Sequence, residues 1–174
     1  MRSNNKRSEI LQAALQVVEE SGANHLTIDR VAERAGFSKG GVLYHFKSKK
    51  DLLRGMLDNL IDNSIQRIEA RRTNGNSLEA LLHEENQMTD AERRASLALV
   101  AAAAEAPELL EPAREYINQV LKQIASESKD PEQALILFLA NEGLRFLNIF
   151  EINPLNSTQA KEVSKKLRQK AKET

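Results

Sequence analysis

The sequence contains no cysteine, which excludes disulfide bonds, thiolate chemistry and cysteine-ligated zinc sites. Its three histidines, His25, His45 and His83, lie far apart, and none is paired with another at the spacing of metal ligands. We therefore expect no metal and no cofactor. Long apolar runs are also missing, since runs such as residues 134–140 stop far short of the about 20 residues that a membrane span needs.

The N-terminal residues 1–7 are basic and polar, without the apolar stretch of a signal peptide. We therefore expect a cytoplasmic protein with no membrane partner. What the sequence does contain is ordinary for a soluble globular protein, with 41% apolar and 29% charged residues. Its 174 residues suffice for one or two small domains with a buried core.

The net charge is zero, but the charges are unevenly distributed. Residues 1–54 hold ten basic and six acidic residues, a net charge of +4, whereas residues 55–174 hold fifteen and nineteen, a net charge of −4. A basic end on a neutral chain indicates a polyanionic partner, although an ordinary solvated surface would give the same numbers.

Apolar residues recur at helical period along almost the whole chain, and no alternating pattern lasts long enough for a strand. Residues that commonly cap or open helices precede several of these stripes: Thr27, Ser38, Ser48, Thr89, Asp130-Pro131 and Asn156 or Ser157. We expect the segment 73–77 to break a long helix that begins at Ser48, and Asn153-Pro154 to close a helix that ends at Ile152. The sequence thus predicts an all-α fold.

Two of the predicted helices are separated by a very short turn. The first begins at Thr27 and ends at Gly36, and the second follows after Phe37 with Ser38 as its cap. This spacing is typical of a helix-turn-helix, in which the two helices cross steeply. The side chains that would fix the crossing are apolar: Ile28, Val31, Ala32, Val42 and Phe46. The outward residues 39–41 and 43–45 combine a cation, hydrogen-bonding tips and glycines, which suits a DNA major groove.

The same segment resembles the DNA-binding domain of the TetR family of bacterial repressors over about the first 55 residues. The matching residues include Ile10, Ala14, Gly22, Thr27-Ile28, Val31-Ala32, Ala35-Gly36-Phe37-Ser38-Lys39-Gly40-Gly41-Val42-Leu43-Tyr44-His45-Phe46-Lys47-Ser48-Lys49 and Leu52-Leu53. Many members place an aromatic residue where this chain has Leu43. A subgroup reads Gly-Gly-x-Leu-Tyr-His-Phe, as this chain does.

The resemblance implies a ligand-responsive, sequence-specific repressor that binds double-stranded operator DNA as a homodimer. It assigns DNA contacts to a set of residues around the helix-turn-helix: Thr27, Ser38, Lys39, Gly40, Gly41, Leu43, Tyr44, His45 and Lys49. Among these, Lys39 has the side chain best suited to reading a base, and guanine is the expected partner. Thr27, Tyr44, His45 and Lys49 would bind phosphates.

The resemblance further implies a DNA-binding domain over residues 1–54 and a helical effector-binding and dimerisation domain over residues 55–174. A hydrophobic or amphipathic small molecule would occupy a pocket with candidate lining residues Leu82, Met88, Leu97, Val100, Leu109, Tyr116, Val120, Phe138, Asn141 and Glu142. Glu142 would favour a cationic effector. Each apolar candidate is also compatible with plain core, and His83 with a solvated position.

The last two predicted helices, 131–152 and 156–172, would pair with their copies in a dimer. Candidate interface residues are Leu135, Leu139, Phe146, Phe150, Val163 and Leu167. The first of these helices is apolar nearly all round, which is also what a central core helix of a monomer would show. Glu142 and Arg145 are spaced for an ion pair within the helix or across the interface.

Three other classes remain compatible with parts of the sequence. A small helical enzyme would need a nucleophile–base pair, a carboxylate cluster or a glycine-rich phosphate loop, and the sequence offers none. An architectural DNA-binding protein would be basic throughout. A helical interaction module that has lost DNA binding would retain the same pattern, and only a binding assay separates it from a repressor.

Overall fold

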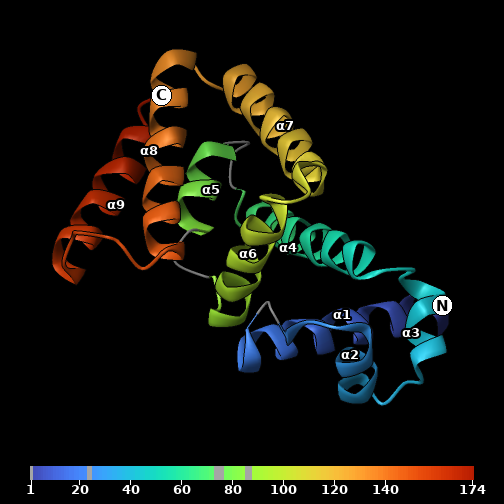
Figure 1. The fold of residues 1–174 in the computed structure, drawn as a ribbon. Helices are drawn as coiled ribbons and strands as arrows, with labels where there is room; N and C mark the ends of the chain where they lie inside the picture. The colour runs from blue at the N-terminus through green and yellow to red at the C-terminus, as the bar shows by residue number, and fades with distance from the viewer. Residues whose placement is uncertain (1, 23–24, 73–76, 85–87) are drawn as a thin grey trace. The chain divides into compact units, whose positions relative to one another are not determined.

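The computed structural model describes residues 2–22, 25–72, 77–84 and 88–174, and every regular element in these ranges is a helix. In chain order they are α1 (Arg2–Ser21), α2 (Ile28–Ala35), α3 (Lys39–His45), α4 (Lys49–Arg71), α5 (Ser77–Glu84), α6 (Asp90–Ala103), the 3-10 turn η3 (Pro107–Leu110), α7 (Glu111–Glu127), α8 (Pro131–Ile149) and α9 (Ser157–Ala171) (Figure 1). The predicted all-α fold is confirmed. No helix in the described ranges is long and apolar enough to cross a membrane.

Side-chain caps begin the helices where the sequence predicted them. The Thr89 hydroxyl accepts a hydrogen bond from the Glu92 backbone N–H while the Glu92 carboxylate accepts one from that of Thr89, which completes a capping box. Asn156 forms a second capping box with Gln159, and Asp130 caps α8 ahead of Pro131. The predicted break at residues 73–76 lies outside the described residues, and Ser77 begins α5.

The end of α8 differs from the expectation. The helix ends at Ile149 instead of Ile152, and Glu151 adopts a left-handed conformation with φ of 56°. A residue in this conformation cannot continue a right-handed helix, so the chain turns before Asn153-Pro154.

The chain divides into two compact units. Unit 1 comprises residues 1–61 and 89–113, and unit 2 comprises residues 62–88 and 114–174. These packing units do not coincide with the domain boundary expected after residue 54, because α6 and η3 pack with the N-terminal helices. The functional division into residues 1–54 and 55–174 stays a prediction.

In unit 1, α1 packs against both α2 and α6. The buried face of α1 includes Ile10, Leu11 and Val18, as its apolar stripe predicted. From α6, Ala95, Ala98 and Leu99 enter the same core, and the small alanines let the helices approach closely. An Arg94 guanidinium N–H also donates to the backbone carbonyl of Glu19 at the end of α1. A helix outside the predicted DNA-binding domain thus completes that domain's core.

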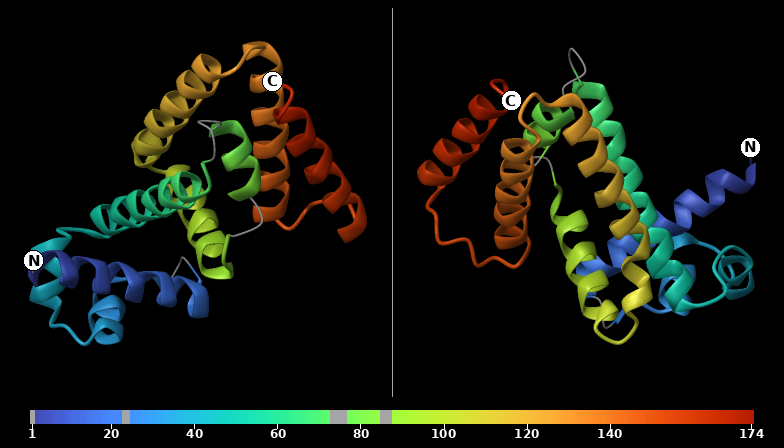
Figure 2. Two further views of the ribbon diagram at one scale, coloured as in Figure 1. Left: turned by 180° about the vertical axis from the view of Figure 1, so that it is seen from behind. Right: turned by 90° about the horizontal axis from the view of Figure 1, so that it is seen from above.

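Unit 2 has a separate core built from α5, α7, α8, α9 and Ile68 near the end of α4. Figure 2 shows α8 and α9 side by side in both views, and α5 contacts both helices. The largest fully buried apolar side chains of this core are Leu82 and Ile124, and Leu137 and Phe138 of α8 belong to the same core.

Glu127 joins three helix ends in unit 2. Its carboxylate accepts hydrogen bonds from the Ser77 backbone N–H at 2.8 Å and from Gln123 Nε2 at 3.1 Å, and it pairs with Arg72 at the end of α4. Burial alone would raise the pKa of Glu127, but these hydrogen bonds and the Arg72 charge outweigh burial and lower it. The carboxylate therefore holds the ends of α4 and α7 and the start of α5 together in its ionised form.

Candidate nucleic-acid interface

The turn between α2 and α3 is built from local backbone preferences. Thr27 caps α2, with its Oγ1 accepting a hydrogen bond from the Arg30 N–H at 3.2 Å. Gly36 ends α2 in the left-handed conformation, φ 69°, and the Phe37 N–H donates back to the Ala32 carbonyl at 3.0 Å. Ser38 then caps α3 at once, accepting from the Gly41 N–H at 3.0 Å. The predicted helix-turn-helix is confirmed.

Buried apolar side chains fix the crossing of the two helices. Val31, Val42 and Phe46 are at most 2% exposed, Ala32 is buried, and Ile28 packs at the margin of the same core. The inward face predicted from the sequence is therefore confirmed.

The outward face of α3 is only partly open to solvent. Lys39, Gly40 and Tyr44 are exposed, Tyr44 to 73%, whereas Gly41, Leu43 and His45 are half-buried. The His45 ring packs edge-on against the Tyr44 ring with centroids 5.1 Å apart. Lys47 Nζ lies over the Tyr44 ring, 5.8 Å from its centroid. This cation–π contact places a positive charge beside the exposed Tyr44 side chain.

The two glycines of α3 are not required by the backbone, because neither has a positive φ. A Cβ at Gly40 would meet only Ser38 Oγ, at 4.0 Å, and a Cβ at Gly41 would meet the same atom at 3.3 Å. The protein itself thus leaves room for a side chain at residue 40. Because glycine has no side chain, the α3 backbone at this residue is open to an external partner.

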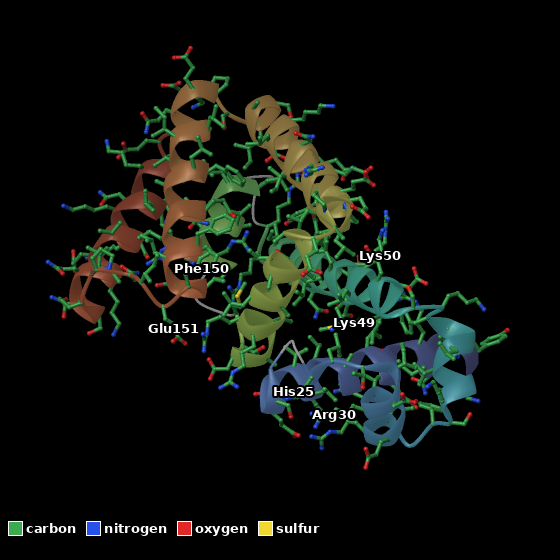
Figure 3. All side chains as sticks on the ribbon, in the orientation of Figure 1. His25, Arg30, Lys49, Lys50, Phe150 and Glu151 are labelled. Carbon is green, nitrogen blue, oxygen red and sulfur yellow. The ribbon has the colours of Figure 1, made fainter. Side chains whose placement is uncertain are left out.

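The start of α4 adds a cluster of cations. Ser48 caps the helix by accepting from the Asp51 N–H at 3.1 Å, and Lys49 and Lys50 are exposed. Figure 3 labels both lysines beside α4 and Arg30 beside α2. Lys50 pairs with Glu108 of η3, and this hydrogen bond lowers the pKa of the Glu108 carboxyl. The segment following α6 therefore contacts the start of α4 directly.

The structure also shows an ion pair at the predicted base-reading residue. Lys39 Nζ lies 3.0 Å from each carboxylate oxygen of Asp29, in the first turn of α2. Sequence reasoning missed Asp29, Lys47 and Lys50 as members of this surface. Lys47 follows the outward Tyr44, and Lys50 follows the helix cap Ser48, so their positions could have indicated both lysines. Asp29 and Lys39 are ten residues apart, and no sequence pattern links them.

The candidate dimer residues fall into two groups. Leu135, Leu139, Phe146 and Phe150 are exposed, and the Phe146 and Phe150 rings stack with centroids 6.4 Å apart. On α9, Val163 is half-buried and Leu167 packs against the unit 2 core. The predicted pair forms within α8, with Arg145 Nε 2.9 Å from Glu142 Oε2.

The candidate effector residues are divided between the units. Those in unit 2 are Leu82, Met88, Tyr116, Val120, Phe138, Asn141 and Glu142; those in unit 1 are Leu97, Val100 and Leu109. Leu109 is part of the unit 1 core, and Val100 is exposed.

Asn141 is the distinctive polar residue of the unit 2 set. It is 2% exposed, and its Oδ1 is buried without a hydrogen-bond partner in the described part of the chain. It follows Ala134, Leu137 and Phe138 on one buried face of α8. On α7, the Tyr116 hydroxyl lies 3.4 Å from Ser64 Oγ of α4.

His83 is exposed. Partial desolvation of the imidazole, followed by the positive charge of Arg168, lowers the pKa of His83. The described residues contain no group of three or more metal-ligating side chains.

Two family models match the sequence. Residues 10–56 match the model of bacterial regulatory proteins of the tetR family, and residues 75–172 match the Tetracyclin repressor-like C-terminal domain. The uncharacterized HTH-type transcriptional regulator YvdT of Bacillus subtilis is 32% identical over 66 residues, which cover 38% of this chain and 34% of that protein. The HTH-type transcriptional regulator BetI of Escherichia coli is 28% identical over 131 residues, 70% of this chain and 67% of that protein. The chain thus spans about a third of the length of the first relative.

Solved structures share the fold. A transcriptional regulator from Rhodococcus sp. Rha1 has a TM-score of 0.74 at 22% identity, covering 96% of this chain and 94% of that one. The multidrug binding protein EbrR complexed with ethidium has a TM-score of 0.69 at 23% identity, covering 93% and 97%. At these identities the likeness establishes the fold.

Proposed function

The chain belongs to the TetR family of transcriptional regulators, and we propose that it is a dimeric repressor released from a palindromic operator by a small-molecule effector. The observation that carries the proposal is the exposed face of α3, on which Lys39, Gly40 and Tyr44 stand out from a helix pair fixed by a buried apolar core. A rigid support and an exposed, cationic, sterically open face are what major-groove recognition requires.

The roles of individual residues follow from their chemistry. Lys39 reads guanine through its ammonium group, and Gly40 and Gly41 let the backbone approach the groove. The Thr27 and Ser38 hydroxyls lie at helix N-termini, where backbone N–H groups favour phosphate. Tyr44, His45 and Lys49 bind flanking phosphates, with Leu43 beside them on α3. This arrangement is that of the subgroup with the Gly-Gly-x-Leu-Tyr-His-Phe recognition helix.

A second copy of the chain supplies the rest of the affinity. The exposed side chains of Leu135, Leu139, Phe146 and Phe150 form an apolar face on α8. Such a face is costly in water and is stabilised by burial against its symmetry mate. Two α3 helices, one per protomer, then address half-sites about 34–36 Å apart.

The effector binds in unit 2, beside the buried face of α8. Most of the candidate lining is apolar, with Leu82 and Phe138 buried there. Glu142 is already neutralised by Arg145, so it provides no free charge for a ligand. Asn141 Oδ1 instead needs a hydrogen-bond donor, since an unpaired buried carbonyl costs about 1–3 kcal/mol. These features favour an amphipathic molecule that carries an N–H or O–H group.

Release depends on α4, which runs without interruption from residue 49 in unit 1 to residue 71 in unit 2. A ligand that tilts or locks this helix moves α3 of each protomer out of register with its half-site. A coupling of about 1–3 kcal/mol is enough for such a switch. Lys50 and Glu108 join α4 to η3 within unit 1, so a displacement of the α6–η3 segment acts on the same helix.

The test is selection of bound sequences from a random duplex pool, run with wild type, Lys39→Ala and Tyr44→Phe. We expect wild type to enrich an inverted repeat, Lys39→Ala to lose or relax one position in each half-site, and Tyr44→Phe to bind the same motif more weakly. Absence of any enriched motif at low salt would overturn the proposal. Ethidium, which intercalates into DNA, is titrated against the protein alone as a first effector probe. With the operator known, Asn141→Leu should reduce release by a ligand that donates to Oδ1.

A further inference from the structure

Asp29 and Lys39 form a contact between the two helices of the helix-turn-helix. Both side chains are exposed, Lys39 to 60% and Asp29 to 68%, and Nζ is equidistant, 3.0 Å, from the two carboxylate oxygens. Neither group is needed by the hydrophobic core. The pair instead occupies the rim of the surface that carries Gly40 and Tyr44.

A carboxylate at this place is unfavourable for a protein that binds phosphates. Between residues 27 and 49 the sequence has only two acids, Asp29 and Glu33, both on α2. Glu33 has no ion pair in the described residues, whereas Asp29 faces Lys39, the one lysine of α3. Asp29 thus neutralises the charge of Lys39, which would otherwise attract DNA of any sequence.

We propose that Asp29 determines the selectivity of Lys39 by competing with DNA for its ammonium group. On a non-cognate sequence Lys39 remains with Asp29, and α3 contributes little attraction. At a guanine, the O6 and N7 acceptors replace the carboxylate, and Lys39 moves into the groove. The competition penalises wrong sequences more than the right one, which is how repulsive elements produce specificity. This inference rests on the proposed DNA-binding function.

Two variants with the same change of charge test the inference. Asp29→Asn removes the competitor, and Glu33→Gln removes one negative charge from the same helix without touching Lys39. Affinities for the selected operator and for a scrambled duplex of equal length are measured by fluorescence anisotropy at one fixed salt concentration, because charge alone changes both affinities. The readout is the ratio of the two affinities.

We expect Asp29→Asn to strengthen binding to the scrambled duplex most, so that the ratio falls about two- to fivefold, the range for an exposed ion pair. Glu33→Gln should leave the ratio unchanged. In a Lys39→Ala background, Asp29→Asn and Glu33→Gln should become indistinguishable. Asp29→Glu, which keeps the charge at the helix N-terminus, should retain most of the wild-type ratio.

Equal ratios for Asp29→Asn and Glu33→Gln would overturn the inference, and so would a change of ratio that persists without Lys39. Either result leaves the proposed function standing, because wild type still prefers its operator. A wild-type protein with no preference for any duplex would instead overturn the proposed function. Thermal unfolding of each variant, followed by circular dichroism, identifies any loss of affinity that comes from misfolding.

Discussion

Gly55 of α4 lies against the ring of Phe46, so that a Cβ at residue 55 would stand 2.6 Å from Phe46 Cε1. The same Cβ would lie 3.1 Å from Leu11 Cδ2 of α1. Arg7 covers the Phe46 ring, with its guanidinium carbon 5.2 Å from the ring centroid. The glycine therefore sets the distance at which α4 packs on the helix-turn-helix.

Replacing Gly55 by alanine should lower the free energy of unfolding. Overpacking a core typically costs about 1–3 kcal/mol, which exceeds the gain of about 1 kcal/mol in helix propensity. Urea unfolding followed by circular dichroism measures the change. The control is Gly143→Ala in α8, where a Cβ meets nothing within 4 Å and the propensity gain should appear alone. Equal behaviour of the two variants would show that α4 can shift without cost.

Gly40→Ala should separate stability from DNA binding. The added Cβ has room within the protein, so helix propensity should raise the free energy of unfolding by up to about 1 kcal/mol. Operator affinity should nevertheless fall, about tenfold or more, because the methyl group occupies space that the DNA backbone or a base edge needs. Anisotropy titration and urea unfolding on the same samples measure both quantities. Unchanged affinity would mean that DNA does not approach this part of α3.

Leu139→Glu should convert the dimer to a monomer. Leu139 is 58% exposed on the apolar face of α8, and a charge there would be buried unpaired in a symmetric interface. Sedimentation velocity measures the oligomeric state. Ile65→Glu, at a similarly large aliphatic residue that is 40% exposed on α4, is the control and should remain dimeric. A Leu139→Glu protein that sediments as wild type would exclude this face as the dimer contact.

Asn141→Leu should stabilise unit 2. The substitution removes the buried carbonyl that lacks a partner and keeps the branching at Cγ, so we expect a gain of about 1–3 kcal/mol in unfolding free energy. Asn118→Leu, at an exposed position on α7, should change stability little. Urea unfolding compares both with wild type. A clear loss of stability in Asn141→Leu would mean that the amide is satisfied in solution by a bound water.

Acid should destabilise unit 2 through Glu127. Its pKa is lower in the folded chain than in the unfolded one, so its contribution is complete above the unfolded value. That contribution disappears as the pH falls through the folded value, below the ordinary glutamate range. The stability difference between wild type and Glu127→Gln should therefore shrink on acidification, as measured by urea unfolding in a pH series. Glu162→Gln on the exposed side of α9 is the control, and a difference independent of pH would contradict the prediction.

The sequence predicted the features of this fold that depend on neighbouring residues. The caps at Thr27, Ser38, Thr89 and Asn156 could be predicted because each bonds a backbone N–H within three residues of itself. The inward face of the helix-turn-helix could be predicted because apolar residues recur at helical spacing between Ile28 and Phe46. In the candidate interface, exposure of Lys39 and Tyr44 followed from the same period.

The contacts that the sequence did not indicate are those between distant residues. Arg94 and Glu19 lie 75 residues apart, and Lys50 and Glu108 lie 58 apart. No local pattern links such pairs, since only the packing of α6 and η3 on the N-terminal helices brings them together. Gly55 was missed for a related reason, because a glycine inside a helical stripe shows its purpose only when Phe46 is seen against it.

The core of unit 1 is assembled from two stretches of chain separated by residues 62–88. At a synthesis rate of about 5–20 residues per second, the ribosome needs roughly 3–10 s between completing residue 61 and completing residue 113. During that interval the nascent helix-turn-helix lacks Ala95, Ala98 and Leu99 of α6. The helix-turn-helix is therefore fully supported only after α6, which lies outside the predicted DNA-binding domain, has been synthesised.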